Sequence, residues 1–541
     1  MSESTVMEKI VALCKRRGFI FQSSEIYGGL NGFWDYGPLG AELKRNLREV
    51  WWKSMTRQRD DVVGLDASII MHPNIWKASG HVDTFSDPMS DCLVTQKRFR
   101  SDQIQPQSGT IYRYTGANSS TGVSSSDPYS VLLVSGKNPE SARKVAKQYY
   151  TQRGATEPEL LGESTESVTN TTSFNPENGG MLTEPRAFNL MLETHVGPIK
   201  SDENRAYLRP ETAQAIFAQY KNVLDSSRLK LPFGICQIGK AFRNEINPRN
   251  YTFRSREFEQ MELEFFIKPD EVTEKLQGSV TQWSEGADLT TPQANWGWEM
   301  WHRYWVAERT TFYASIGLGA DVLDYHWQKP EELAHYARAC VDILFKFPFG
   351  TEELEGIAAR GSYDLDQHSK FVGKPQDYFD EEAKLRYVPH VIEPSAGLDR
   401  LALAVLCAAF HEEETVDEKG KKEVVTTLKL HPKIAPIKVG IFPLLKNKPE
   451  LVSRAKDIYR KLSQQMNAFY DESGSIGRRY ARQDEVGTPF CITVDFETLE
   501  GIKEGDQAGQ LETVTLRHRD SKKQERIPTS ELLAKITELI G

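Results

Sequence analysis

The sequence predicts an α+β protein that is built around an antiparallel β-hairpin, carries an inserted lobe and ends in a separate α/β domain. In residues 233–266, polar and apolar side chains alternate with a period of two in two successive segments. Residues 101–180 depart from ordinary globular composition, and residues 437–541 alternate strand-like with helix-like segments. These three observations define the predicted fold class.

Composition limits the classes of protein that fit. The chain has 541 residues, of which 39% are hydrophobic and 26% charged, as in a globular protein with several domains. Its net charge of −9 excludes a protein that binds nucleic acid mainly through its overall charge, but it does not exclude binding through a local basic patch. Six scattered cysteines without a CxxC pair, and no apolar leader, favour a cytoplasmic location. The longest apolar stretch, residues 401–410, is too short to cross a membrane.

The first 100 residues contain two predicted helices. Residues 8–18 form a short one that ends at a glycine. A glycine-rich loop then carries Phe33, Trp34 and Tyr36. Apolar residues recur every three or four positions over residues 41–55, which predicts a long amphipathic helix with one face against a core or a partner.

Residues 101–180 are predicted to form a small lobe between two flexible edges. The edges, residues 117–130 and 162–180, are rich in turn-forming residues. Between them, residues 131–134 favour a strand and residues 140–150 a helix.

Ordinary globular composition returns over residues 181–410. Residues 411–436 begin with a charged run that predicts a linker. The strands and helices expected in the last domain are, in order, residues 438–442, 450–466, 490–496, 513–519 and 530–540.

The hairpin places polar residues on one face. Its two strands contribute Gln237, Gly239, Ala241 and Arg243, and Phe258, Gln260, Glu262 and Glu264. Met261, Leu263 and Phe265 point to the opposite, apolar face. Because Gly239 and Ala241 leave room above the sheet, the pattern predicts a platform for an extended anionic ligand with a cationic end. An ordinary amphipathic hairpin with solvated charges is the alternative.

Two further segments add charged groups. Arg400 lies in the first turn of the apolar helix, where backbone N–H groups favour phosphate, unless it is a surface cap. Glu353 and Arg360 suit a metal and a substrate carboxylate, although this signal is weak by itself. The sequence has no P-loop, no complete dinucleotide fingerprint, no HExxH motif and no nucleophile elbow.

At these residues the sequence resembles the class II aminoacyl-tRNA synthetases, and more narrowly the dimeric bacterial and eukaryotic-type glycyl-tRNA synthetases. Residues 233–266, with Phe242-Arg243-Asn244-Glu245, are similar to the family's motif two, residues 393–400 to motif three and residues 32–40 to motif one. Residues 208–214 and 473–480 add two family signatures. Asp399 departs from the glutamate that is usual in motif three.

The resemblance implies an antiparallel-sheet catalytic domain in residues 1–100 and 181–410. It implies that residues 437–541 form an anticodon-binding domain. The implied reaction joins glycine to ATP as glycyl-adenylate, with Mg²⁺, and then transfers glycine to the 3′ end of tRNA(Gly). A homodimer through motif one, with Pro38 at the interface, is also implied.

The resemblance further assigns roles to single residues. Arg243 and Arg400 are expected on the α- and γ-phosphates, Phe258 on the adenine ring, and Glu353 at Mg²⁺; with Glu262, the two arginines are the expected catalytic residues. The full expected ATP site is Arg243, Asn244, Glu245, Phe253, Arg254, Phe258, Glu353, Leu354, Gly397 and Arg400. The expected glycine site is Arg100, Glu211, Glu262, Arg360, Glu393 and Ser395. Expected RNA contacts in the last domain are Arg478, Arg479, Arg482, Arg517 and Arg519.

Other functions remain open from the sequence alone. A class II synthetase for another small amino acid, such as alanine or serine, is one. A paralogue that binds RNA without catalysis is another, although Arg243 and Arg400 argue against it. The lobe at residues 101–180 is expected near the tRNA acceptor stem and is not expected to be an editing site.

Overall fold

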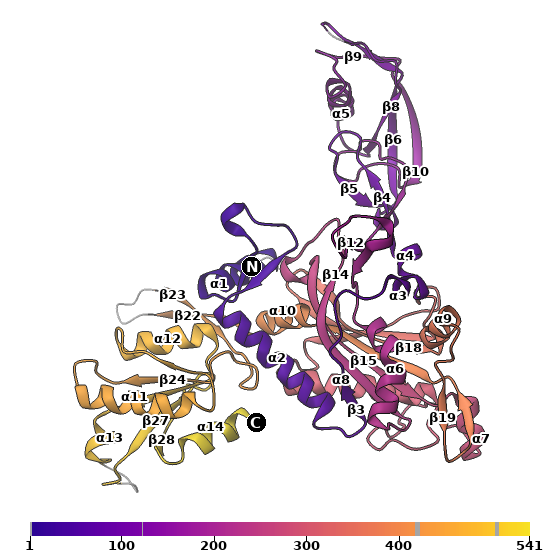
Figure 1. Cartoon of the computed structure of the whole chain (residues 1–541). Helices are drawn as coiled ribbons and strands as arrows, with labels where there is room; N and C mark the ends of the chain where they lie inside the picture. Colours follow the sequence, from indigo (N-terminus) through magenta and orange to yellow (C-terminus); the bar gives the residue numbers. More distant parts are fainter. Residues whose placement is uncertain (1–2, 122, 417–421, 504–507) are drawn as a thin grey trace. The chain divides into compact units, whose positions relative to one another are not determined.

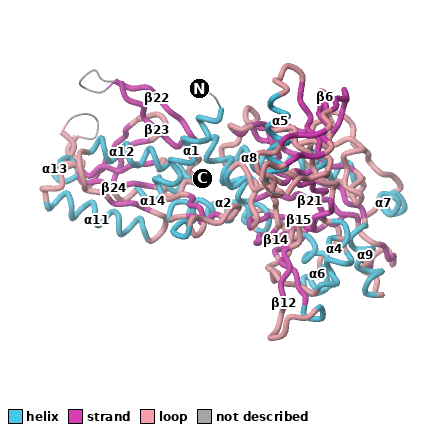
Figure 2. The backbone as a smooth tube through the Cα atoms, turned by 90° about the horizontal axis from the view of Figure 1, so that it is seen from above, coloured by secondary structure: helices cyan, strands magenta, loops and turns pink. Residues whose placement is uncertain are grey.

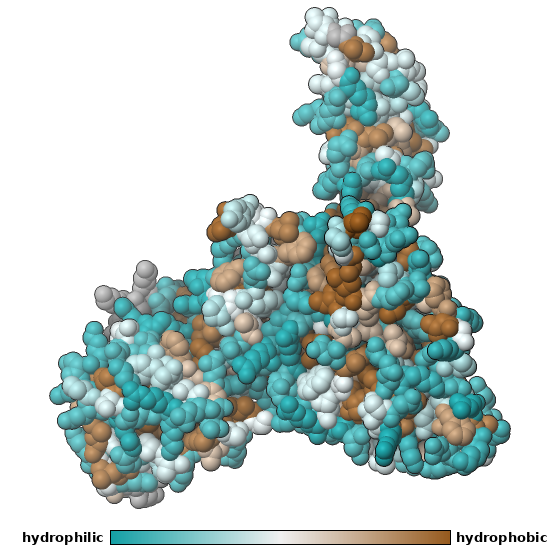
Figure 3. Space-filling model, in the orientation of Figure 1, coloured by the Kyte–Doolittle hydropathy of each residue, from teal (hydrophilic) through white to brown (hydrophobic). Residues whose placement is uncertain are grey.

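The computed structural model describes residues 3–121, 123–416, 422–503 and 508–541 (Figure 1). The chain forms two compact units. The core unit comprises residues 3–79, 193–243 and 248–541, and the inserted unit comprises Gly80–Leu192 with Asn244–Asn247. No helix in the described ranges is both long and apolar enough to span a membrane. Hydrophilic residues predominate over the C-terminal domain on the face shown in Figure 3.

A seven-stranded sheet forms the centre of the core unit. Its strand order is β16-β17-β18-β21-β15-β14-β3, and only the pairing of β3 with β14 is parallel. The strands are β3 (Val62–Gly64), β14 (Phe233–Phe242), β15 (Glu257–Ile267), β16 (Leu323–Trp327), β17 (Ala339–Phe347), β18 (Gly350–Gly361) and β21 (His390–Gly397). The expected antiparallel sheet is thus confirmed.

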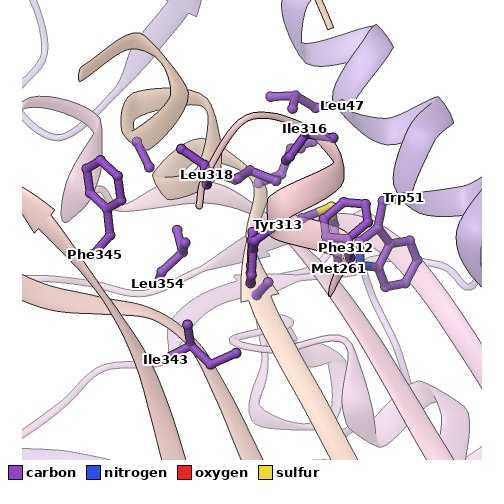
Figure 4. Packing of buried hydrophobic residues seen from close by; sticks show 14 of the residues in the cluster. Leu47, Trp51, Met261, Phe312, Tyr313, Ile316, Leu318, Ile343, Phe345 and Leu354 are labelled. Atoms are coloured by element: carbon purple, nitrogen blue, oxygen red, sulfur yellow. The ribbon is translucent and has the colours of Figure 1, made fainter. Parts of the chain in front are cut away.

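The apolar face of this sheet is covered by three helices. They are α2 (Pro38–Thr56), α8 (Trp298–Ser315) and α10 (Leu398–Ala409). Trp51 of α2, Met261 of β15 and Tyr313 of α8 are buried in one cluster, as Figure 4 shows. The predicted amphipathic helix therefore turns its apolar stripe into the core of the chain, where Leu43, Leu47 and Trp51 are buried.

The other face of the sheet is also covered at the end that carries Phe233 and Phe266, whereas Phe258 and Arg243 at its other end stay partly exposed. Helices α6 (Ala213–Ser227) and α9 (Tyr363–Val372) contribute residues to a second cluster with Phe233 and Phe266. The room above Gly239 is taken by Arg209, because a Cβ at Gly239 would lie 2.1 Å from Arg209 Nη2. The remaining core elements are α1 (Glu3–Arg17), β1 (Ile20–Gln22), β2 (Trp34–Tyr36), α3 (Pro73–Ala78), β12 (Leu192–His195), β13 (Arg205–Leu208), α7 (Asp270–Gln277), β19 (Tyr378–Asp380) and β20 (Leu385–Tyr387).

The inserted unit is wider than the predicted lobe at residues 101–180. Its elements are α4 (His81–Thr84), β4 (Ser86–Asp91), β5 (Arg98–Arg100), β6 (Gln107–Tyr114), β7 (Gly116–Asn118), β8 (Tyr129–Val134), α5 (Glu140–Thr151), β9 (Glu159–Leu161), β10 (Ser164–Thr171) and β11 (Arg186–Asn189). The expected strand and helix are present as β8 and α5. The expected flexible edge at residues 162–180 is wrong in part, because β10 pairs with β6 in a three-stranded sheet. Residue 122, in the other predicted edge, lies outside the described residues.

The predicted linker at residues 411–436 contains a β-hairpin, β22 (Phe410–Val416) with β23 (Lys422–Leu428). Residues 417–421 of this linker lie outside the described part of the chain. The C-terminal domain has a five-stranded sheet in the order β25-β24-β26-β27-β28, and Figure 2 shows α11 and α12 near β24. Its elements are β24 (Val439–Pro443), α11 (Pro449–Ser463), β25 (Ala468–Tyr470), α12 (Ile476–Val486), β26 (Phe490–Val494), α13 (Phe496–Glu500), β27 (Thr513–His518), β28 (Gln524–Pro528) and α14 (Leu532–Ile540). The predicted α/β domain is confirmed, although α12, α13, β25 and β28 were not predicted.

Candidate active site

A row of residues crosses five strands of the central sheet. Gln237, Glu262, Ser395, Gly356 and Asp342 are successive register partners on β14, β15, β21, β18 and β17. Register partners point to the same face of a sheet, and neighbouring strands lie about 4.8 Å apart. The row therefore brings residues from three distant parts of the sequence, the β14–β15 hairpin, the β17–β18 hairpin and β21, onto one line.

Asp399 ties the three motifs together next to this row. Its Oδ1 accepts hydrogen bonds from Tyr36 Oη at 2.6 Å and Lys44 Nζ at 2.7 Å. Its Oδ2 accepts one from the backbone N–H of Glu259 at 2.7 Å. The aspartate that departs from the usual motif-three glutamate thus holds motif one and motif two in place.

Glu262 is fixed from several sides. Its Oε1 accepts hydrogen bonds from Ser395 Oγ at 2.7 Å and Gln260 Nε2 at 2.9 Å. Its Oε2 accepts one from the Thr212 hydroxyl and one from the Thr212 backbone N–H, at 3.0 Å, at the N-terminus of α6. Burial and the charge of Glu211 raise the pKa of Glu262, although the bonds from Thr212 and Ser395 lower it. Both carboxylate oxygens are consequently held in one orientation.

Arg360 already bonds to two carboxylates of the protein. Its Nη1 donates to both oxygens of Glu393, at 2.9 and 2.8 Å, and its Nε and Nη2 donate to Asp364 at 2.7 and 2.9 Å. A guanidinium has five N–H groups, so little of its donor capacity is left for a substrate carboxylate. Burial outweighs this ion pair and raises the pKa of Glu393 to about 7. In this structure Arg360 holds Glu393 and Asp364, and its expected role at the glycine carboxylate stays a prediction.

Gln214 links these groups into one assembly. Its Nε2 donates to Asp364 Oδ1 at 2.9 Å and to Glu211 Oε1 at 3.2 Å, and its Oε1 lies 3.0 Å from His368 Nε2. We call the five carboxyl groups gathered here the acidic cluster: Glu211, Glu262, Glu264, Asp364 and Glu393. Within the described ranges, no group of three or more such side chains has the geometry of a metal site.

Two arginines stand against aromatic rings nearer the start of β15. The Arg243 guanidinium lies 5.4 Å from the centroid of the Phe258 ring, and its Nε donates to the backbone of the loop before α6 at 3.1 Å. The Arg400 guanidinium lies 4.5 Å from the Phe253 ring, and its Nη1 is 3.3 Å from Glu353 Oε1. Arg400 is partly exposed, with 28% of its side chain accessible. This end of the sheet therefore combines flat apolar surfaces with positive charge.

Leu354 and Gly397, two residues expected at ATP, can contact a ligand only through their backbone atoms. Leu354 is buried in the apolar core on the opposite face of the sheet (Figure 4), so only its backbone can meet a ligand. Gly397 lies beside Arg400, and a Cβ there would be 3.4 Å from Arg400 Cγ. Arg254 is half-buried in the loop between β14 and β15, where its N–H donates to Arg249 O at 3.3 Å.

Arg100, Asn244 and Glu245 belong to the inserted unit, and their expected place at the ATP and glycine sites stays a prediction. Within that unit, Arg100 donates to Asp102 at 2.7 and 3.1 Å and lies 3.1 Å from Asp87. The hydrogen bond to Asp102 raises the pKa of Arg100, burial opposes it, and the charges of Asp87, Asp102 and Glu245 add to the rise.

Sequence reasoning missed several members of the site. Asp364 bonds directly to Arg360, and Asp342 completes the row, whereas Gln260, which was expected on the polar face without a role, bonds to Glu262. The alternation in β17 and the four-residue spacing of Arg360 and Asp364 were the available signals.

Three of the five expected RNA contacts are structural. Arg479, Arg517 and Arg519 are buried. Arg517 forms a two-bond ion pair with Asp484 at 2.8 and 2.9 Å, and the other two donate to backbone carbonyls. Arg478 is exposed, while Arg482 bonds to Asp471.

Comparison with known proteins agrees with this architecture. Residues 196–287 match the tRNA synthetase class II core domain (G, H, P, S and T), and residues 438–539 match the anticodon binding domain. The central sheet, its three motifs and the C-terminal domain thus define a class II aminoacyl-tRNA synthetase.

Full-length relatives narrow the class further. The chain is 43% identical to the glycine–tRNA ligase of Treponema denticola over 98% of its own length and 96% of the relative. It is 42% identical to that of Rhodopirellula baltica, with 98% of each covered, and 43% identical to that of Borreliella burgdorferi, with 99% and 98% covered. The chain belongs to the glycine–tRNA ligase family.

Proposed function

We propose that the face of the central sheet binds ATP at its Phe258 end and glycine at Glu211, Glu262, Glu393 and Ser395, so that this glycine–tRNA ligase forms glycyl-adenylate between the two sites. One observation carries the proposal: the strand register places Phe258 and Glu262 four residues apart on one face of β15. That separation is about 13 Å, which suits a purine at one end and an amino acid joined to the α-phosphate at the other.

Positioning and charge supply the catalysis in this proposal. The glycine carboxylate attacks the α-phosphorus, and pyrophosphate leaves; the bond to the adenylate forms as the bond to pyrophosphate breaks. Arg243 neutralises the α-phosphate and Arg400 the γ-phosphate, because each guanidinium stands beside a ring that can support the nucleotide. Adenine stacks on Phe258, and Phe253 lines the phosphate end.

Glycine binds through its ammonium group. Glu262, Glu393 and Ser395 face it with Glu211, and their oxygens are held by the bonds described above. Arg360 fixes Glu393 and offers at most one remaining N–H to the glycine carboxylate. The family resemblance supports four further ligands: Arg100 for glycine, and Asn244, Glu245 and Arg254 for ATP. Gly397 and Leu354 contribute to the ATP site through their backbone atoms.

Glu353 is the residue we propose for Mg²⁺. A carboxylate oxygen is a hard ligand, and Mg²⁺ is typically held by one or two carboxylates together with substrate phosphates, so a single glutamate beside Arg400 fits the ion. The ion would neutralise charge on the pyrophosphate that leaves.

The second step transfers glycine to the 3′-hydroxyl of tRNA(Gly). The C-terminal domain is the proposed anticodon reader, with Arg478 and Arg482 as the remaining arginine contacts of the five. We further propose a homodimer through motif one, a cytoplasmic location that suits six free cysteines, and a place for the inserted unit near the acceptor stem.

The test is ATP–pyrophosphate exchange with each amino acid in turn. Exchange with glycine alone supports the proposal. Exchange with alanine or serine instead would assign another substrate, and a lack of exchange with every amino acid would contradict catalysis.

A further inference from the structure

Glu264 is a buried carboxyl group for which the described residues provide no hydrogen-bond donor. It lies on β15, two residues beyond Glu262 on the same face, and it is fully buried. Neither of its carboxyl oxygens meets a partner in the part of the chain that the structure describes. A buried ionised carboxylate without donors is costly, so this arrangement needs an explanation.

The other carboxyl groups of the acidic cluster are provided with donors. Glu262 accepts four hydrogen bonds, and Asp364 accepts two from Arg360 and one from Gln214. Glu393 accepts both of its bonds from a guanidinium. Donors stabilise the ionised form of a carboxyl group, so the cluster stabilises charge at these three positions and not at Glu264.

Like charges around Glu264 act in the same direction. Burial and the charges of Glu393, Glu262 and Asp364 raise the pKa of Glu264 far above its ordinary value, and Arg360 opposes them only in part. The charged groups that act on it are Glu262 on β15, Glu393 on β21, Arg360 on β18 and Asp364 on α9, and Gln214 connects Glu211 before α6 and His368 on α9 to Asp364. Carboxyl groups this close do not all ionise together, and the one without donors keeps the proton.

We propose that Glu264 is a positioning residue that stays protonated beside the ammonium site, so that Glu262 and Glu393 can keep their negative charges for glycine. A neutral carboxyl occupies this buried position without repelling either glutamate. An ionised Glu264 would instead push protons onto its neighbours and weaken their hold on the substrate ammonium. This inference rests on the proposed glycine site.

Infrared spectroscopy tests the protonation state without any substrate. At about pH 8.5, above the pKa of about 7 for Glu393, wild-type protein should show the band of a protonated carboxyl group. The band should shift when glutamate is labelled with ¹³C at its carboxyl carbon, and it should be absent from Glu264→Gln. A wild-type spectrum without a glutamate band of this kind overturns the inference, and that measurement needs no variant to fold.

Kinetics with two matched variants tests the function. Glu264→Gln replaces a neutral carboxyl by a neutral amide of equal size, so the glycine KM and kcat in pyrophosphate exchange should stay within about threefold of wild type. Glu262→Gln, the same change two residues away, removes a charge from the ammonium site and should raise the glycine KM by about 100-fold.

An equal rise in both variants would overturn the inference, because Glu264 would then be an ionised ligand. An unchanged glycine KM in Glu262→Gln contradicts the proposed glycine site itself, and in that case the infrared band still decides the state of Glu264.

Discussion

Ser395→Ala is a direct test of how the ammonium site is held. Ser395 Oγ donates a 2.7 Å hydrogen bond to Glu262 Oε1, and the bonded carboxylate is almost completely buried. A hydrogen bond to a charged group contributes about 1.5–3 kcal/mol, and each 1.4 kcal/mol corresponds to about tenfold. The variant should therefore lose about 10- to 150-fold in kcat/KM for glycine.

The assay is glycine-dependent ATP–pyrophosphate exchange, with glycine and ATP varied separately. The KM for ATP should change by less than about twofold, because Phe258, Arg243 and Arg400 keep their contacts. The bond from Ser395 lowers the pKa of Glu262, so its removal raises that pKa. Glu262 of the variant is then protonated at a higher pH, and the loss of activity should grow as the pH falls.

A matched control is Ser463→Ala in α11, where the hydroxyl donates only to a backbone carbonyl of its own helix at 3.1 Å. That variant should catalyse ATP–pyrophosphate exchange at the rate of the wild-type protein. If Ser395→Ala folds normally and loses less than about twofold, the hydroxyl does not orient Glu262, and the assignment of the ammonium site to this carboxylate is wrong.

Three further predictions concern charge. Burial raises the pKa of Glu393 to about 7, so its carboxyl group loses its charge as the pH falls. The glycine KM should therefore rise between about pH 8 and pH 6, while the ATP KM stays level. A glycine KM that does not change with pH would contradict a role for the charge of Glu393. Arg517→Ala removes both guanidinium bonds to buried Asp484, which keeps its bond from Lys522, and should cost about 1.5–3 kcal/mol of domain stability, seen as a lower Tm, while pyrophosphate exchange continues at temperatures where the protein stays folded. Arg478→Ala should keep the Tm and raise the KM for tRNA, and an unchanged tRNA KM would remove this residue from the RNA contacts.

The hairpin could be predicted from sequence because its alternation records which face is apolar. Met261 and Leu263 are buried as their period of two requires, and Glu262 points the other way. What covers the polar face could not be predicted in the same way. Arg209 and Thr212 reach it from a segment about 50 residues away from Glu262 in the sequence, and no local pattern reports such a contact.

Strand β10 and the β22–β23 hairpin could not be predicted because their sequences lack the alternation that revealed the β14–β15 hairpin. Most side chains of β10 are exposed on both faces, so the segment carries no alternation and its composition is that of a loop. Backbone pairing with β6 defines this strand instead. Composition likewise could not distinguish buried Arg517 from exposed Arg478, because the partner Asp484 lies 33 residues away in the sequence.

The proposed glycine site also explains how a small substrate can be selected without a second, hydrolytic site. Every competing amino acid is larger than glycine, so a rigid pocket can reject it by steric exclusion, whereas a large pocket discriminates against a smaller analogue only about 10- to 200-fold. The hydrogen bonds around Glu262 make the pocket rigid, because Thr212, Ser395 and Gln260 donate to both of its carboxylate oxygens. A larger side chain would have to displace one of these groups and leave a buried carboxylate short of a donor, which costs more than the added apolar contact returns. The hydrogen bonds that position the ammonium ligand thereby also define the size limit of the substrate.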